Sequence, residues 1–369
     1  MSQATKLVER GRELRPSAVQ VLPKIVLPWL LGLGIAGILH VLAPNLGDFW
    51  AKIVLDSGIA IILAVSLTMV NGFTGQFSMG HAGFMALGGY TAAAITYYGS
   101  FKLWGTPVLH PGAGTALYVV ACILGGLVAA GAGYVVGLPS LRLRGDYLAI
   151  VTLGFGEIFR VLIQRTESVV PMRTPAELEA ANGKGVVELL SSVGGALGFN
   201  GLPFYTSTFW VYSFVMVTLL TAYRLKTSSW GRAFLSVREN EIAAEAMGIH
   251  TTKVKVRAFV VSAFFAGIAG GLFAHELGTT LNAKELGFQK SFDIIIMVVL
   301  GGMGSVSGAV VAAIILTILP EPLRAFDQYR MIIYALALIL MMILRPQGLF
   351  GIREVWELGF LKKLVGEKR

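Results

Sequence analysis

The sequence is poor in the groups on which most catalytic and metal sites depend. It has one cysteine, Cys122, and only 14% charged residues, whereas globular domains contain about a quarter. A single thiol excludes an internal disulfide and a cysteine-rich metal site. The five histidines show no metal-ligand spacing, and no G-x-x-x-x-G-K-[ST] segment is present to hold ATP phosphates. We therefore predict no catalytic residue, no metal and no cofactor bound by this chain itself.

Apolar residues and glycine are abundant instead. Hydrophobic residues make up 55% of the 369 positions, the mean hydropathy is +0.72, and there are 45 glycines. This composition is typical of helices that pack closely in a lipid bilayer, because small residues let helix backbones approach. The net charge of +9 does not indicate a nucleic-acid partner, since the basic residues lie between apolar runs and therefore indicate membrane topology.

The apolar runs predict an all-α polytopic membrane protein. Runs long enough for spans of about 20 residues recur along the chain, and one further run, 292–319, is too long for one span and too short for two. The first run follows a basic tail without a cleavage pattern, so we expect a retained span and not a signal peptide. The eight expected spans are 25–43, 51–70, 79–98, 116–138, 147–164, 207–223, 258–275 and 329–344.

The distribution of lysine and arginine predicts the orientation of the chain. Twenty of the thirty lie in the N-terminal tail 1–24, the turn 139–146, the loop 224–257 and the C-terminal tail 345–369. Short loops rich in lysine and arginine stay in the cytoplasm. Both termini and the 224–257 loop are therefore expected in the cytoplasm, on either side of a transmembrane domain over 25–344.

The number of crossings predicts a re-entrant or broken helix at 292–319. The chain is expected outside before this run and inside after the last span, so 292–319 must return to the side from which it entered. The turn is expected within VLGGMGSVSGAV (299–310), with Gly301, Gly302 and Ser305 on the substrate pathway. Non-helical backbone at membrane depth needs protein or a wet cavity around it. The alternative is one long tilted helix.

A second interrupted segment lies in the first half of the chain. The stretch NGFTGQFS (71–78) carries no lysine or arginine, so we expect it to be folded into the membrane. Gly-interrupted segments in both halves are the pattern by which broken helices mark a transport pathway. Asn71, Gln76, Ser78 and His81 are polar but mostly uncharged, which suits passage of a small zwitterion or neutral solute. The alternative is that they hydrogen-bond neighbouring helices.

One acid and one base lie inside a single expected span. Glu157 and Arg160 are three residues apart within 147–164 and share one helix face. A charge at the bilayer centre costs at least ~2.5–3.5 kcal/mol. We therefore expect an intramembrane ion pair, with a role in the pathway or gate as the alternative. Asp56 and Asp293 lie near the outer ends of their spans, where hydration lowers this cost.

The largest external element is expected to be the loop 165–206. Its TPAELEAA stretch carries helix start signals, with Thr174 as N-cap, Pro175 in the first turn and Glu177 as the partner in a capping box. The loop is either a docking surface for an external partner or a capped solvent loop.

The loop 224–257 is the most elaborate of the expected cytoplasmic elements. RENEIAAEAMGI predicts a short helix with three glutamates and a small apolar side, ended by Gly248. Such a helix suits the groove of a soluble motor that drives a passive gate. The alternative is a helix lying on the lipid headgroups, although such helices favour basic faces. The residues expected to couple the chain to a motor are Arg232, Arg238, Glu239, Glu241, Ala243, Ala244, Glu245 and Gly248.

Five blocks in consistent order, over roughly residues 50–352, resemble the M-type permease subunit of bacterial branched-chain amino-acid ABC importers. They are GQFSMGHAGFMALGGYTAA, LRLRGDYLAIVTLGFGEIFR, GRAFLSVRENEIAAEAMGI, FFAGIAGGLFAH and LRPQGLFG. The resemblance implies a multi-pass subunit of the bacterial inner membrane, with a second, H-type permease, two cytoplasmic ATP-binding subunits and a periplasmic solute-binding protein as partners. It also implies that 239–248 resembles the coupling helix that contacts an ATPase.

The sequence departs from the family in two places. Ile242 stands where the family's coupling motif has glutamate, with Glu241 beside it, and 166–206 lacks the glycine- and proline-rich pattern of the family's outer loop. Urea permease relatives share the glycine-rich blocks, so a urea or short-amide ABC permease is an alternative.

Two alternatives come from other classes of protein. An ion-coupled secondary transporter would need an ionisable residue in the middle of a span, for which Glu157 is the candidate. A membrane serine protease would use Ser78 and His81, but the run around Ser305 and Ser307 lacks the G-x-S-G arrangement of such enzymes.

Overall fold

The computed structural model describes residues 18–105, 112–140, 146–172, 174–276, 280–323, 329–344, 347–351 and 354. These residues form helices and connecting segments, with one isolated bridge between Phe199 and Leu281 and no strand. Of the expected N-terminal tail 1–24, residues 1–17 lie outside the described residues. Of the expected C-terminal tail 345–369, only 347–351 and 354 are described.

Each of the eight expected spans coincides with one helix. Six of these helices have segments long and apolar enough to cross a membrane among the described residues. The prediction of an all-α polytopic membrane protein is therefore confirmed. The eight helices are α2 (Ala18–Leu42), α3 (Asp48–Asn71), α4 (His81–Trp104), α5 (Ala113–Ser140), α6 (Asp146–Gln164), α9 (Thr208–Thr227), α12 (Thr251–Ala274) and α15 (Arg330–Leu344).

The run 292–319 forms two short helices, α13 (Phe288–Gly301) and α14 (Val306–Ile318), which pack against each other. Gly302 and Gly304 both have φ of +107° in the connecting turn, a conformation that glycine adopts without steric cost. A helix of 14 residues spans about 21 Å, less than the roughly 30 Å hydrocarbon core. The predicted broken helix is confirmed, and the alternative of one long tilted helix is wrong.

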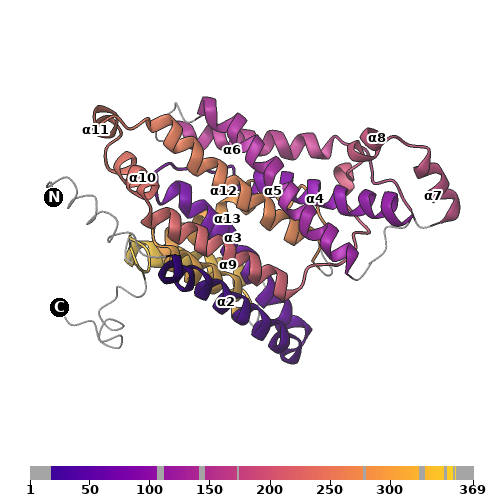
Figure 1. Cartoon of the computed structure of the whole chain (residues 1–369), viewed down its shortest axis with the longest axis horizontal. Helices are drawn as coiled ribbons and strands as arrows, with labels where there is room; N and C mark the ends of the chain where they lie inside the picture. Colours follow the sequence, from indigo (N-terminus) through magenta and orange to yellow (C-terminus); the bar gives the residue numbers. More distant parts are fainter. Residues whose placement is uncertain are drawn as a thin grey trace, which may run out of the picture.

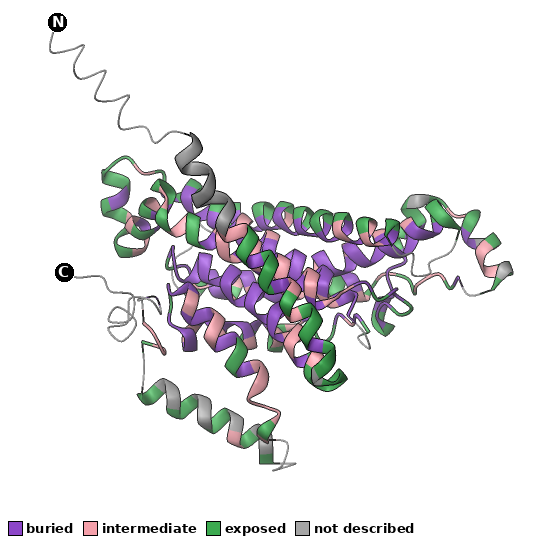
Figure 2. Cartoon of the chain, turned by 60° about the horizontal axis from the view of Figure 1, so that its bottom comes forward, coloured by how far each residue is buried: buried purple, intermediate pink, exposed green. Residues whose placement is uncertain are grey.

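The centre of the bundle consists of α3, α4, α5 and α12. In α3 and α12, 83% and 72% of the residues in the candidate spans are buried. In the segment that includes most of α2 only 17% are buried, because α2 lies at the periphery of the bundle (Figure 2). The α4–α12 contact depends on glycine, because a Cβ on Gly88 would lie 2.2 Å from the Cα of Gly267. Small residues at this crossing let the two backbones pack directly.

Short helices lie at the two ends of the bundle (Figure 1). At one end are α7 (Pro175–Asn182) and α8 (Val186–Ser191), and at the other are α10 (Ser229–Glu239) and α11 (Glu241–Ala246). The predicted capping box is present at α7, where Thr174 accepts from the backbone N–H of Glu177 and the Glu177 side chain accepts from the backbone N–H of Thr174. Two 3₁₀ turns complete the described elements, η1 (Ala43–Leu46) and η2 (Gly195–Leu197).

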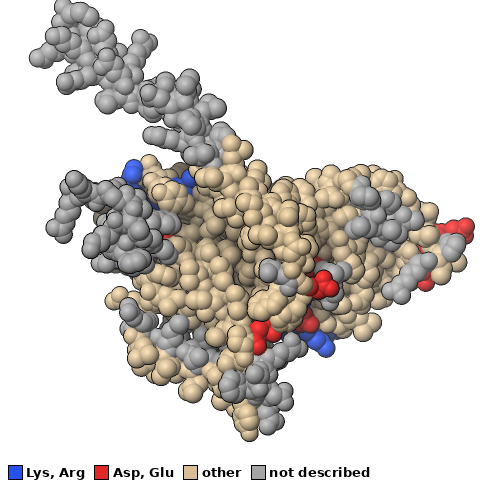
Figure 3. All heavy atoms as spheres, turned by 90° about the horizontal axis from the view of Figure 1, so that it is seen from below, with Lys and Arg blue, Asp and Glu red and all other residues tan. Residues whose placement is uncertain are grey.

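The face of the molecule seen in Figure 3 is largely uncharged. Lysine, arginine and acidic side chains gather in a few groups, and broad areas without charge separate them. A surface of this kind suits a lipid environment, since charged side chains are costly at membrane depth.

Candidate functional site

The two glycine-interrupted segments meet inside the bundle. The chain between Asn71 and His81 is non-helical and mostly buried, and it contacts the turn between α13 and α14. A Cβ on Gly72 would lie 2.7 Å from the backbone nitrogen of Gly304. The sequence places these segments more than 200 residues apart, and the structure brings them into backbone contact.

The four polar residues predicted in the first segment are all buried. Asn71 Oδ1 accepts a hydrogen bond from the backbone N–H of Ser78, 3.1 Å away, and His81 Nε2 lies 2.9 Å from Ser66 Oγ. The side-chain amide of Gln76 and the Nδ2 atom of Asn71 have no hydrogen-bond partner among the described residues. The side chains of Asn71 and His81 therefore stabilise the local fold through these contacts. The side-chain amide of Gln76 remains available to another group.

The predicted residues of the second segment shape the α13–α14 turn. Ser305 Oγ accepts from the backbone N–H of Gly308 at 3.0 Å and so caps α14. A Cβ on Gly301 would lie 2.5 Å from the backbone of Gly308, and one on Gly302 would lie 2.4 Å from the carbonyl oxygen of Gly351. Gly301 and Gly302 thus permit close backbone packing, and no larger residue fits there without movement.

The loop 224–257 contains two helices, not one. The prediction of one continuous helix over RENEIAAEAMGI is wrong, because the helix is interrupted at Asn240. The Asn240 side chain accepts a hydrogen bond from the backbone N–H of Ala243 and so caps α11. Arg238 and Glu239 therefore belong to the end of α10, and Gly248, with φ of +83°, follows α11. Asparagine is a preferred N-cap residue, so this signal was present in the sequence.

The tip of this loop exposes apolar side chains. Ile242 and Met247 are 67% and 83% exposed, and Ala243, Glu245 and Ala246 are also exposed. Ala244 is buried against the rest of the loop. An exposed apolar patch rimmed by polar residues is typical of a protein contact.

Two more of the predicted coupling residues make contacts within the loop or with the start of α12. Arg232 donates to the hydroxyl of Ser229 at 3.1 Å. Glu241 forms an ion pair with Lys255 of α12, with 2.5 Å between Oε1 and Nζ. Lys255 was not predicted, and the pair fixes α11 to the start of α12.

Two basic residues near α10 hold the interrupted segments. Arg238 Nη1 donates to the carbonyl oxygen of Gly72 at 2.8 Å and to that of Met303 at 3.5 Å. Lys226, at the end of α9, donates to the carbonyl oxygen of Gly304 at 2.8 Å. The loop that carries α10 and α11 is therefore connected directly to both glycine-rich segments.

A buried carboxylate that sequence analysis missed completes this cluster. Glu354, only 3% exposed, lies 2.5 Å from Lys226 Nζ and accepts from the backbone N–H groups of Val306 and Ser307 and the Ser305 hydroxyl. These contacts place a negative charge at the N-terminus of α14, where the helix dipole favours it. Burial alone would raise the pKa of Glu354, but the hydrogen bonds from Lys226 and Ser307 outweigh burial and lower it.

The segment before Glu354 caps the other short helix. The backbone N–H groups of Leu349 and Phe350 donate to the carbonyl oxygens of Leu300 and Gly301, at 2.7 and 3.4 Å. The end of α13 and the start of α14 are thus both satisfied by residues that follow α15.

The intramembrane ion pair predicted between Glu157 and Arg160 has a clear geometry. Arg160 Nε lies 2.6 Å from Glu157 Oε2, and both side chains are partly exposed. The second oxygen of Glu157 accepts from the backbone N–H of Phe288 at 3.1 Å. The pair therefore also links α6 to the N-terminus of α13.

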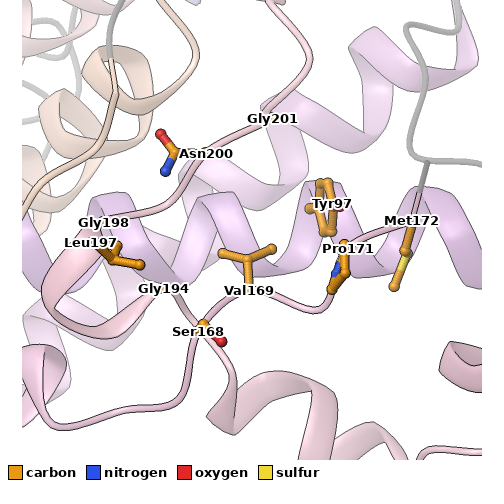
Figure 4. Close-up of a pocket in the computed structure, with 10 residues that line it drawn as sticks. All are labelled: Tyr97, Ser168, Val169, Pro171, Met172, Gly194, Leu197, Gly198, Asn200 and Gly201. Atoms are coloured by element: carbon orange, nitrogen blue, oxygen red, sulfur yellow. The ribbon is translucent and has the colours of Figure 1, made fainter. Parts of the chain in front are cut away.

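A cavity of about 500 Å³ lies between α4 and the loop 165–206. Figure 4 shows Tyr97 of α4 beside Pro171 and Val169 of the loop. Gly194, Gly198 and Gly201 lie in the chain that passes the cavity, and all three have positive φ. This end of the bundle therefore offers a concave surface built largely by the loop.

Comparisons with known proteins identify the family. Residues 49–344 match the family described as branched-chain amino acid transport system / permease component. The high-affinity branched-chain amino acid transport system permease protein LivM of Escherichia coli (strain K12) is 37% identical over 309 residues, which cover 79% of this chain and 67% of the relative. The probable branched-chain amino acid transport permease protein LivM of Methanocaldococcus jannaschii is 24% identical, with 86% of this chain and 98% of the relative covered.

The corresponding LivH permease protein of Escherichia coli (strain K12) is 27% identical over 306 residues, which cover 80% of this chain and 92% of the relative. No solved structure matches the chain. The family match extends over most of the polypeptide and includes both interrupted segments and the loop that carries α10 and α11. The chain therefore belongs to the family of permease components of branched-chain amino acid transport systems.

Proposed function

We propose that this chain is the M-type permease of an ATP-driven importer and carries branched-chain amino acids across the bacterial inner membrane. The relatives are named as permeases for these amino acids. Both LivM and LivH proteins are similar to the chain, which supports pairing with an H-type permease of the same fold. In this assembly the chain forms one half of the pathway and binds no cofactor.

The α10–α11 end of the bundle faces the cytoplasm in this proposal. Twenty of the thirty lysines and arginines lie in the segments assigned to that side, including both tails, and such loops remain in the cytoplasm. The α7–α8 end then faces the periplasm. The loop 165–206, with the cavity beside Tyr97, provides the surface for a periplasmic solute-binding protein.

The single observation that supports the mechanism best is the contact of Arg238 with Gly72 and Met303. A motor that displaces α10 and α11 would displace Arg238 and, through the adjoining end of α9, Lys226. Their acceptors lie on the two interrupted segments, so the displacement would separate or close the Gly72–Gly304 contact. Such a change requires the motor to contact the two states differently.

Two cytoplasmic ATP-binding subunits are the proposed motor. The exposed apolar side chains of Ile242 and Met247 suit the hydrophobic groove of a soluble protein, the usual mode of recognition for a short helix. When the gate opens, cargo passes the interrupted segments without covalent chemistry. The pathway residues in this proposal are Asn71, Gln76, Ser78, His81, Gly301, Gly302 and Ser305.

Reconstitution tests this function. The chain is co-expressed with its H-type permease and ATP-binding subunits, placed in liposomes with the solute-binding protein outside, and assayed with radiolabelled leucine. We expect uphill leucine uptake only with ATP inside the liposomes. Uptake driven by an ion gradient without ATP, uptake of urea in place of leucine, or uphill transport by this chain alone would each contradict the proposal.

A further inference from the structure

A second cavity, of about 540 Å³, lies between α3, α13 and α14. Its volume is within the range of about 300–1,000 Å³ that small-molecule sites occupy. On α3 it extends from Asp56 to Leu63, whereas the Gly72–Gly304 contact lies beyond the end of that helix. The cavity is therefore on the α7–α8 side of the closed contact, where an entering solute would arrive first.

Part of the lining of this cavity is aliphatic. Side chains from all three helices contribute to it, and Phe273 of α12 also lines the cavity. A lining of this kind binds branched hydrocarbon side chains by removing their apolar surface from water. The aliphatic residues are Ile59, Leu63, Ile294, Met297 and Leu316.

The lining also includes two opposite charges from one helix. Lys290 and Asp293 are three residues apart on α13, so they lie on the same helix face. Each is partly buried. Among the described residues neither forms an ion pair, and the Lys290 ammonium lies over the ring of Phe273, 6.0 Å from its centroid.

Unpaired charges within a span are costly unless they face water or a charged ligand. Glu276 is paired with Lys52 at 2.7 Å, and none of the acids that line the cavity, Asp56, Asp293 and Glu321, forms an ion pair with Lys290 among the described residues. Asp56 also lines the cavity and adds negative potential there. The α13 pair is therefore available to a ligand that carries one positive and one negative group bonded to the same carbon atom.

We propose that this cavity binds the transported amino acid as a zwitterion on its way to the gate. The carboxylate of the amino acid pairs with Lys290, its ammonium pairs with Asp293, and its branched side chain lies against Leu63, Ile294 and Met297. This inference rests on the proposed function, since it assigns a stopping place for the same cargo. It adds a site that selects for both charged groups of an α-amino acid as well as for its side chain.

The first experiment changes the charges in the reconstituted complex. Lys290→Gln and Asp293→Asn are each expected to lower the leucine uptake rate at least tenfold, while ATP hydrolysis stimulated by the solute-binding protein continues. The double variant Lys290→Asp/Asp293→Lys is expected to recover part of the uptake, because both signs return to one face. Lys284→Gln and Asp48→Asn, at exposed positions outside the cavity, serve as matched controls and should transport normally.

The second experiment detects occupancy directly. The native Cys122 is buried, so Thr317→Cys introduces an accessible thiol into the cavity lining. We expect leucine to slow its labelling by a membrane-impermeant thiol reagent, and neither isopentylamine nor 4-methylpentanoate to do so, because each lacks one charge. A cysteine at the exposed Val187 should be labelled equally with and without leucine.

The outcomes separate this inference from the function on which it rests. If the unmodified complex fails to transport leucine, the proposed function fails. If it transports leucine but both charge variants transport normally, or leucine leaves Thr317→Cys labelling unchanged, the cavity is not a substrate site and the function stands.

Discussion

The guanidinium of Arg238 donates to the carbonyl oxygen of Gly72 across 2.8 Å, so the last turn of α10 is joined to the end of α3. A carbonyl that follows a helix end lacks an intrahelical partner, and a charged donor satisfies it strongly. The same guanidinium reaches Met303 in the α13–α14 turn. One side chain therefore connects a surface loop to both interrupted segments.

Removal of this connection should uncouple the loop from the gate. We expect Arg238→Ala to reduce ATP-driven leucine uptake at least tenfold while the assembled complex still hydrolyses ATP, because the loop remains intact but its link to Gly72 is lost. Paired uptake and hydrolysis assays on proteoliposomes measure this. Lys253→Ala removes one positive charge at an exposed position of the same loop and should leave both rates unchanged. Equal losses of both rates in Arg238→Ala would contradict the link.

The Gly72–Gly304 contact should tolerate no side chain at position 72. A Cβ there would lie 2.6 Å from the carbonyl oxygen of Thr68 and 2.7 Å from the backbone nitrogen of Gly304. Overpacking of this kind costs about 1–3 kcal/mol, so Gly72→Ala should lower the midpoint of thermal unfolding in detergent and abolish uptake. Gly34→Ala is the control, since no atom lies within 4 Å of its added Cβ. An unchanged midpoint for Gly72→Ala would show that the segments separate without cost.

The arrangement of spans follows from the sequence because membrane crossing imposes a length. Apolar runs of about 20 residues predict one helix each, and the structure has a helix at every predicted span. The broken element α13–α14 follows from counting crossings, and the cap at Thr174 follows from local hydrogen-bond chemistry. These features depend on nearby residues or on the thickness of the bilayer.

Features that depend on tertiary contact could not be predicted in the same way. Nothing near Glu354 in the sequence indicates that it caps α14, because its partners Lys226 and Ser307 are 128 and 47 residues away. The contact between Gly72 and Gly304 likewise requires the folded bundle. Both interrupted segments were recognisable from glycine content, but their meeting point was not.

The Glu354 cluster should make stability depend on pH in the acid range. Its pKa is lowered from 4.5, so the folded state favours the carboxylate, and this stabilisation is present above about pH 4.5 and lost as the pH falls through the lower folded-state pKa. We expect Glu354→Gln to lower the free energy of unfolding by about 1.5–3 kcal/mol at pH 7, the range for hydrogen bonds to charged groups. The difference from the unmodified chain should shrink below pH 4.5.

Thermal unfolding in detergent across pH 3–8 measures this difference. The control is Glu188→Gln, because Glu188 pairs with Lys184 at 3.2 Å on the exposed surface of the loop 165–206. Surface pairs of this kind contribute little, so that variant should follow the unmodified chain at every pH. A constant gap between the unmodified chain and Glu354→Gln from pH 8 to pH 3 would exclude the carboxylate as its cause.

The exposed tip of α11 should determine binding of the ATP-binding subunits without determining the fold of the permease. Met247 is 83% exposed, so Met247→Asp removes no packing inside the chain, yet it would bring a charge into an apolar groove of a partner, where an unpaired charge is costly. We expect co-purification of the ATP-binding subunits to fall at least tenfold while the H-type permease still co-purifies. Val187→Asp makes the same change at an equally exposed position at the opposite end of the bundle and should retain the ATP-binding subunits. If Met247→Asp retains those subunits, the motor contacts another part of the loop, the α10 surface around Arg232. The apolar tip would then lie on the lipid headgroups.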